Sequence, residues 1–406
     1  MEGFGRERYS YSIKVNDSFT NKATTMRFNR YMAVILRLFA IIGIDITLSI
    51  KSNRSKRFTK ILLTFYRWIM SVLVCYCLAA RLYKASGPNV PLMLSFSESV
   101  ATASSVVIRF VILFNKSSVV KIIRSLTKSQ SECTSIQHVR NEKIFFCFGL
   151  GGVIFTFCLS MMKALAELRS INGFQMYKKA YLFSTDVNNL TLDSSVADPF
   201  VWTSHLLYIA NLYGVPGLSL LLCCLICQTV TFSISDFTKK LKEKRNDGGT
   251  TEKNLTTDII FYLSKLKCLI LETENALSPI LFFLYSYQFS SLFYIVSLTM
   301  RSKLGLDKVK ITYIATAFST LATFYAILSV WVARIHESVN QMHDEVVLTS
   351  GKHLSIRDMT AVLTSAREFL RNTKITGWGV FVIDRNFLLT SVGMVISYGV
   401  ILMQFS

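Results

Sequence analysis

Proline and charged residues are scarce in this chain. Only five of its 406 residues are proline and 17% are charged, whereas 51% are hydrophobic. The mean hydropathy of +0.41 is too high for a soluble protein of this size. The composition therefore favours an all-α integral membrane protein that crosses the bilayer several times.

Patterns that carry catalysis or bind metal are also missing from the sequence. It contains no phosphate-binding glycine loop, no paired carboxylates in a plausible cleft and no His-Glu-x-x-His motif. Cys224 and Cys227 lie in an apolar run without His or acidic neighbours, so we interpret them as buried small hydrophobes. None of the nine cysteines lies in a predicted outer loop, so no extracellular disulfide framework is implied. We expect no enzyme activity, no metal and no cofactor.

The net charge of +20 does not indicate nucleic-acid binding, because the basic residues lie between hydrophobic stretches rather than in one folded domain. The first 25 residues are polar and basic, with no apolar core and no small-residue cleavage site. We expect the N-terminus to stay in the cytoplasm.

Hydrophobic runs predict seven transmembrane helices. An earlier run, Met32–Ile50, is interrupted by Arg37 and Asp45. We interpret it as an interfacial or re-entrant helix, with a full span as the alternative. The seven predicted spans are Ile61–Tyr83, Pro91–Phe114, Ile144–Leu165, Trp202–Phe232, Pro279–Met300, Val309–Ile335 and the last stretch, 375–406.

Two arginines within the predicted spans have structural roles in this interpretation. Arg67 and Arg109 lie near the cytoplasmic ends of their helices, from which a long side chain reaches the headgroups by snorkelling. Gly214 and Pro216 predict a kink in the fourth span.

The charge bias of the loops predicts the orientation of the chain. Lys and Arg are most frequent in the N-terminal region and after spans two, four and six. This places the N-terminus inside and the C-terminus outside, opposite to a G-protein-coupled receptor. Asn189, in the sequon Asn189-Leu190-Thr191, would then lie outside and is a candidate for glycosylation.

These patterns divide the chain into four parts. Residues 1–60 form a cytoplasmic N-terminal region, 61–335 contain six spans with an extracellular ligand pocket, 336–374 form a cytoplasmic assembly helix, and 375–406 form the seventh helix. The stretches Asp236–Glu274 and Glu337–Lys374 are too amphipathic for loose linkers and too charged to span. We expect them to pack together beneath the membrane, with Leu363 and Phe369 in the contact that joins subunits.

Polar and aromatic residues recur at the outer ends of several spans. Interhelical hydrogen bonding is one interpretation of them, and the wall of a pocket for a small organic ligand is the other. The candidate ligand residues are Glu98, Thr102, His205, Tyr208, Asn211, Ser290, Tyr294, Tyr313 and Thr316.

The last span carries a stripe of polar and small residues. Asn386, Thr390, Gly393, Ser397 and Gln404 recur at intervals of three, four or seven, which places them on one helical face. Such a stripe predicts either helix packing through small residues or a helix that lines an aqueous path.

The same segment resembles the C-terminal signature of insect gustatory receptors. Ser397-Tyr398 is followed by five residues and Gln404-Phe405, with Gly377, Phe381 and Arg385 upstream. Ser397 stands where that family usually has Thr, which keeps the hydroxyl.

This resemblance implies a tetrameric ligand-gated cation channel with seven helices per subunit. The pore would be lined and gated by Ser397, Val400, Ile401 and Gln404, while Tyr398 and Phe405 would pack against neighbouring helices. Expected partners are a small-molecule tastant, membrane lipid, permeating cations, and further copies or other gustatory receptors. The expected location is the plasma membrane of a sensory-neuron dendrite.

We therefore predict a taste receptor and favour bitter or other non-sugar ligands. An odorant receptor of the same superfamily is one alternative. An inverted seven-helix receptor that signals through G proteins is another.

Overall fold

A bundle of long helices forms this protein. The computed structural model describes residues 19–46, 57–85, 92–130, 136–183, 194–246, 252–301 and 308–404. Its helices are α1 (Phe19–Ile41), α2 (Arg57–Ala85), α3 (Leu92–Phe114), α4 (Lys116–Gln130), α5 (Ile136–Arg169), α6 (Ile171–Tyr181), α7 (Ser194–Ile209), η2 (Ala210–Gly214), α8 (Val215–Asn246), α9 (Glu252–Arg301), α10 (Lys308–His353), α11 (Ile356–Asn372) and α12 (Arg385–Gln404). A two-stranded antiparallel sheet, β1 (Thr376–Gly377) and β2 (Phe381–Val382), lies between α11 and α12.

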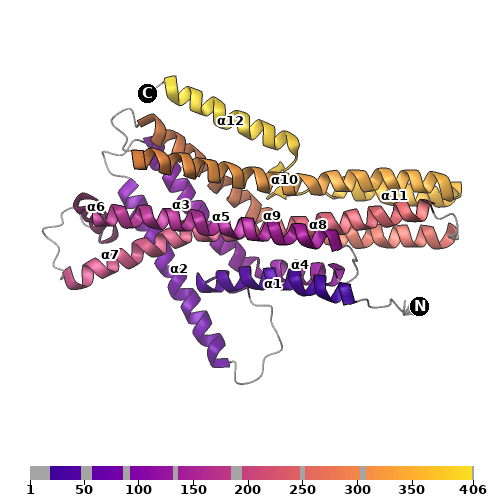
Figure 1. Ribbon diagram of the computed structural model, residues 1–406, viewed down its shortest axis with the longest axis horizontal. Helices are drawn as coiled ribbons and strands as arrows, with labels where there is room; N and C mark the ends of the chain where they lie inside the picture. The colour runs from indigo at the N-terminus through magenta and orange to yellow at the C-terminus, as the bar shows by residue number, and fades with distance from the viewer. Residues whose placement is uncertain are drawn as a thin grey trace, which may run out of the picture.

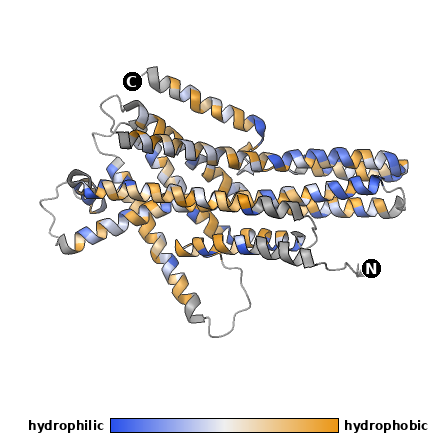
Figure 2. Ribbon diagram, viewed as in Figure 1, coloured by the Kyte–Doolittle hydropathy of each residue, from blue (hydrophilic) through white to orange (hydrophobic). Residues whose placement is uncertain are grey.

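Six helical segments within the described residues are long and apolar enough to cross a membrane. Each overlaps one of the first six predicted spans, so those predictions are confirmed at this level. Figure 2 shows hydrophobic residues along the middle of the long helices and hydrophilic ones where α10 and α11 run together. The seventh predicted span contains α12, whose 20 residues extend about 30 Å.

The core of the bundle is centred on α8. All residues of this helix from Val215 to Val230 are buried, including Cys223, Cys224 and Cys227. A helix that is apolar all round is stable only when neighbours cover every face. Figure 1 shows α8 in the middle of the long bundle, where it contacts α9 and α10.

At one end, α8, α9, α10 and α11 continue together beyond the apolar region (Figure 1). Three ion pairs join them: Lys244–Asp258 at 2.6 Å, Arg245–Glu345 at 2.8 Å and Lys267–Glu368 at 2.6 Å. The hydrogen bond from Lys267 lowers the pKa of the Glu368 carboxyl. The two amphipathic stretches recognised in the sequence thus pack against each other within one chain.

Two details of this region differ from the sequence-based expectation. The fifth predicted span begins at Pro279, but the helix there, α9, already begins at Glu252 and runs on through Pro279. Phe369 was expected at a contact between subunits, but it is 1% exposed and packs in the core of its own chain.

The end of α1 explains the arginine within the second predicted span. Arg109 donates from Nη1 to the carbonyl oxygen of Ile42 at 2.7 Å and from Nη2 to that of Gly43 at 3.2 Å. These carbonyls follow the last turn of α1, where no intrahelical donor remains for them. Arg109 is only 1% exposed, so the expectation that it snorkels is wrong.

Arg67 has a different partner. It forms an ion pair of 3.1 Å with the buried Asp45, and Lys116 approaches the same carboxylate at 3.7 Å. Asp45, which interrupted the first apolar run in the sequence, therefore joins the segment after α1 to α2 and α4.

Where the sequence predicts a kink in the fourth span, the structure has a single π-helical turn, η2. It ends two residues before Pro216, which has no backbone N–H to continue the normal helical pattern. Between the third and fourth predicted spans lies α6, whose first turn is capped by the Ser170 side chain.

The hairpin before α12 has a tight turn. Trp378 and Gly379 both have positive φ, 50° and 70°, and Val380 N–H donates to the Gly377 carbonyl at 2.9 Å. Positive φ at both central residues is typical of a type I′ turn, and the pairing of Gly377 with Phe381 makes the whole loop three residues long. The turn is held on α9, because Trp378 N–H donates to Ser278 Oγ at 2.8 Å.

Candidate functional site

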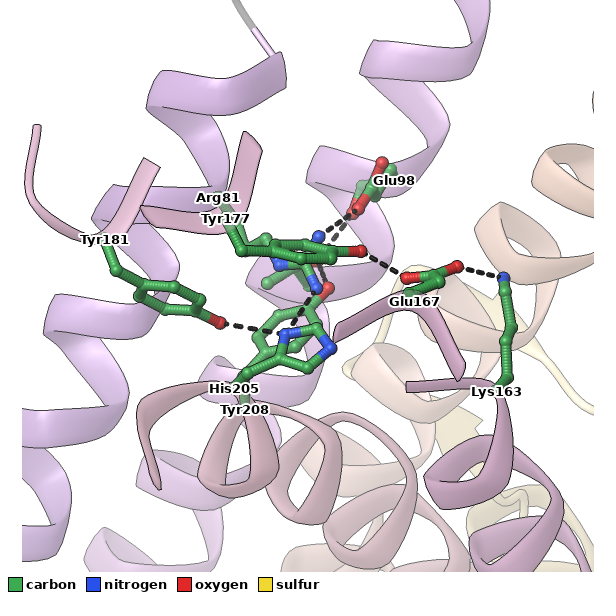
Figure 3. Close-up of polar contacts among 9 residues, drawn as sticks. Arg81, Glu98, Lys163, Glu167, Tyr177, Tyr181, His205 and Tyr208 are labelled. Carbon is green, nitrogen blue, oxygen red and sulfur yellow. Dashed lines mark hydrogen bonds and ion pairs between the residues drawn. The ribbon is translucent and has the colours of Figure 1, made fainter. Parts of the chain in front are cut away.

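A buried arginine lies at the end of the bundle that the loop charges predict to be outer. Arg81, on α2, is 6% exposed, and Figure 3 shows its guanidinium surrounded by side chains from α3, α6 and α7. Its Nη1 is 3.5 Å from Glu98 Oε1 on α3, and its Nη2 is 3.1 Å from His205 Nδ1 on α7. We call this group, with Tyr177, Tyr181 and Tyr208, the arginine cage.

Aromatic rings enclose the guanidinium. Arg81 Cζ lies 4.7 Å from the ring centre of Tyr177 and 4.1 Å from that of Tyr208. Contacts of this kind between a cation and an aromatic face are stronger away from water. Tyr177 also lies 4.3 Å, centre to centre, from the His205 ring, and Tyr181 OH is 3.3 Å from His205 Nδ1.

Charged residues form the more exposed edge of the cage. The Tyr177 hydroxyl donates to Glu167, which is 3.7 Å from Lys163 on the same helix. Lys84 Nζ lies 4.5 Å from the centre of the Tyr177 ring. The side chains of Glu98, Lys163 and Glu167 are 26%, 33% and 37% exposed, so this edge is the accessible one.

The cage continues inward through hydrogen bonds from α3 to the end of α7 and the start of η2. Thr102 Oγ1 is 3.1 Å from Tyr208 OH. One α-helical turn deeper, Ser105 donates to the backbone carbonyl of Asn211 at 2.8 Å and accepts from Asn211 Nδ2 at 3.2 Å. The π-helical turn is thereby tied to α3 by both its backbone and its side chain.

A small cavity of about 20 Å³ lies beside this turn, between α5, α8, α9 and α10. Its wall includes Val153, Thr156, Tyr213, Gly217, Gln288 and Phe324. Gln288 is 2% exposed, and its Oε1 has no hydrogen-bond partner among the described residues. The wall is therefore mainly apolar and aromatic with a few polar atoms.

The structure brings together some of the ligand residues that the sequence singled out. Glu98, Thr102, His205 and Tyr208 meet in and beside the cage. Tyr294, on α9, is partly buried and packs against the hydrophobic core. Tyr313 accepts a cation–π contact of 4.6 Å from Lys163.

The other candidates lie differently. Asn211 bonds to Ser105, Ser290 is buried on α9, and Thr316 donates to the Thr312 carbonyl of its own helix at 2.7 Å. Asn189 and Phe405 lie outside the described residues.

The central residue of the cage, Arg81, was missed by the sequence reasoning, as were Tyr177 and Tyr181. Two signals were available in the sequence. Arg81 is a charged residue two positions before the outer end of a predicted span, and Tyr177 and Tyr181 are four residues apart, on one face of a helix.

The polar stripe of α12 faces away from the bundle. Asn386, Thr390, Gly393 and Ser397 are exposed, whereas Phe387, Leu388 and Ser391 pack towards the rest of the chain. Tyr398 packs on Phe293 of α9 at 4.8 Å between ring centres. Val400 is 49% exposed, and Ile401 and Gln404 continue the same helix.

Residues of the C-terminal signature lie around the start of α12. Phe381 stacks on Phe387 with ring centres 4.6 Å apart, and Arg385 pairs with Glu337 on α10. A polar groove of about 480 Å³ lies beside this pair, between α10 and α12. Gly377 has no room for a side chain, because a Cβ there would lie 2.4 Å from the Phe381 ring.

No protein-family model matches the chain, and no curated protein matches it in sequence. Solved structures do resemble it in fold. The insect olfactory receptor OR5 from Machilis hrabei is similar with a TM-score of 0.67 at 14% identity, over 94% of this chain and 100% of that one. The chain has the fold of an insect olfactory receptor.

The same receptor solved in complex with eugenol is similar with a TM-score of 0.70 at 12% identity and the same coverage. That likeness extends over nearly the whole chain. At these identities the comparison concerns the fold, and the function is argued below.

Proposed function

We propose that the protein is a chemoreceptor: a ligand-gated, non-selective cation channel opened by small-molecule tastants. The observation that carries the proposal is the match of the whole chain to the insect olfactory receptor fold. The same receptor was also solved in complex with eugenol, a small organic molecule. The C-terminal signature, from Gly377 to Gln404, supports the gustatory branch of this superfamily.

The ligand site lies at the predicted outer end, in the cage and the small cavity beside η2. Aromatic rings from α6, α7, η2, α9 and α10 supply an apolar wall, and Thr102, His205 and Gln288 supply polar atoms. A π-helical turn is a frequent feature of functional sites, because it turns side chains out of the regular helical register.

The pore is formed by α12 from four copies of the chain. Its exposed polar stripe supports this, since a polar face on a spanning helix needs water or a partner beside it. Its exposed apolar residues also require a cover; Leu389, Met394 and Ile396 are 68%, 63% and 62% exposed in the single chain. Four α12 helices would place Ser397, Val400, Ile401 and Gln404 around one axis.

An odorant receptor is the second candidate, because the solved structures with this fold are olfactory receptors. A panel of soluble bitter compounds, sugars and volatile odorants separates the two. It is applied to cells that express the chain alone and with candidate partner subunits. Soluble compounds are expected to evoke current, and a response confined to volatiles would make the chain an odorant receptor.

The same cells distinguish a channel from a receptor that signals through G proteins. Ligand-evoked cation current should persist when G-protein signalling is blocked. Loss of every response under the block would overturn the channel proposal.

A further inference from the structure

The arginine cage determines which nitrogen of His205 carries its proton. A guanidinium has five N–H groups and no acceptor, so the contact between Arg81 Nη2 and His205 Nδ1 requires Nδ1 to accept. The imidazole is therefore protonated on Nε2, and its Nε2–H points away from Arg81 towards the side where Lys163 lies (Figure 3).

This Nε2–H is a buried donor without an acceptor. His205 is 0% exposed, and its Nε2 has no hydrogen-bond partner in the described part of the chain. The Nε–H of Arg81 is in the same state. Leaving such a group unpaired costs about 1–3 kcal/mol, and each such group in a folded protein needs an explanation.

The charges of the cage do not cancel. Arg81, Lys84 and Lys163 are cationic, whereas Glu98 and Glu167 are anionic, which leaves one excess positive charge with His205 neutral. Glu98 pairs with Arg81 and Glu167 with Lys163. Lys84 forms no ion pair within 4.0 Å among the described residues; its Nζ lies against the face of Tyr177 and interacts with Glu98 and Glu167 only at longer range.

Among the six residues that define the cage, the two buried polar atoms without a partner in the described part of the chain, Arg81 Nε and His205 Nε2, are thus both hydrogen-bond donors. We propose that the cage binds a small organic carboxylate, with His205 Nε2–H donating to it and Lys84 balancing its charge. Arg81 is a positioning residue that holds His205 in the required tautomer. This inference rests on the proposed ligand site and names the chemical class of its ligand.

The edge of the cage gives such a ligand a route. Glu98, Lys163 and Glu167 are partly exposed, while the tyrosine rings and His205 behind them are buried. A carboxylate entering here passes paired charges and reaches a donor shielded from water, where a charge-assisted hydrogen bond is strong. A protonated amine would meet the excess positive charge of the cage, which repels it.

Binding to the purified full-length protein in lipid nanodiscs tests the class. The probes are acetate, butyrate and benzoate at neutral pH, each compared with its amide and with the primary amine of the same skeleton. The carboxylates should raise the thermal unfolding midpoint more than the amides, and the amines should not raise it. Stabilisation by amines, or by none of the probes, would overturn the carboxylate site.

Two substitutions at one position test the donor. His205→Gln places an amide N–H near the position of Nε2, whereas His205→Asn reaches only the position of Nδ1 and keeps an acceptor for Arg81. His205→Asn should weaken carboxylate binding on the order of tenfold or more, and His205→Gln should largely retain it. Equal carboxylate binding by both variants would show that His205 is not the donor.

A matched pair of lysines tests the charge. Lys84→Met should weaken carboxylate binding, while Lys179→Met, an exposed lysine on α6 outside the cage, should not.

Measuring ligand-evoked currents separates this inference from the proposed function. Ligand-evoked current without any carboxylate stabilisation would leave the channel proposal standing and refute the carboxylate site. Thermal stabilisation by carboxylates without current from any ligand would leave the carboxylate site standing and refute the channel proposal.

Discussion

The side-chain amide of Asn115 donates to two successive carbonyl oxygens of α9, those of Asn275 at 3.1 Å and Ala276 at 3.0 Å. Asn275 is four residues before Pro279, which has no N–H to offer its carbonyl. Asn115 thus replaces a helical hydrogen bond that proline removes. It links the α3–α4 junction to the segment of α9 that holds the hairpin before α12.

We expect Asn115→Ala to destabilise the protein by about 1–3 kcal/mol, because two carbonyls lose their shared donor. The free energy of unfolding in detergent measures this. Ser117→Ala, at an exposed position in the next turn, is the matched control and should change stability little. Equal stability of both variants would show that water replaces the Asn115 amide.

The turn after α1 should not tolerate a side chain at Gly43. Its φ is +81°, and a Cβ there would lie 2.7 Å from Arg109 Nη2. Gly43→Ala should therefore lower the thermal unfolding midpoint, with backbone strain alone costing about 1 kcal/mol or more. Gly351→Ala is the control; it lies within α10 with nothing within 4 Å of the added Cβ, so it should be neutral or mildly stabilising.

The hairpin before α12 offers a similar test that reaches the gate. Gly377→Ala would push the Phe381 ring, which stacks on Phe387 in the first turn of α12. We expect ligand-evoked current per surface-expressed receptor to fall severalfold in this variant. Gly351→Ala, on α10 with nothing within 4 Å of the added Cβ, is the control and should leave the current unchanged. A normal current from Gly377→Ala would exclude the hairpin from gating.

The predicted orientation can be read on intact cells. An epitope fused after Ser406 should be stained without permeabilisation, and one fused before Met1 should be stained only after it. The reasoning is the excess of Lys and Arg in the N-terminal region and in the loops after even-numbered spans. The opposite staining pattern would contradict the predicted orientation and the channel architecture proposed from it.

The gate prediction concerns Ile401. If four α12 helices form a narrow apolar ring there, an ion cannot cross it with its hydration shell, so the channel is closed. Ile401→Ser should raise ligand-independent current, and substitution of Gln404 should alter conductance or selectivity. Leu402→Val, on another face of the helix, is the control. Cysteines at 397, 401 and 404 that resist aqueous thiol reagents, while one at 402 reacts, would refute the pore assignment.

Features that depend on neighbours along the chain were readable from the sequence. The apolar runs have the length of a bilayer, and the helical period places Asn386, Thr390 and Ser397 on one face of the last helix. The proline and glycine after Tyr213 indicated an irregular helix, although not that it would be a π-helical turn. Both hydropathy and side-chain periodicity are local properties, so no tertiary structure was needed.

The partners of buried polar groups were decided only by the tertiary structure. Arg81 and His205 are 124 residues apart, and Arg109 lies 67 residues from Ile42. Nothing local predicts such pairs, because each arises where two helices cross and a buried charge or orphan carbonyl must find a partner. The same holds for Phe369, whose apolar face looked suited to another subunit but fills the core of its own chain. A helical pattern states that one face must be covered; only packing decides which surface covers it.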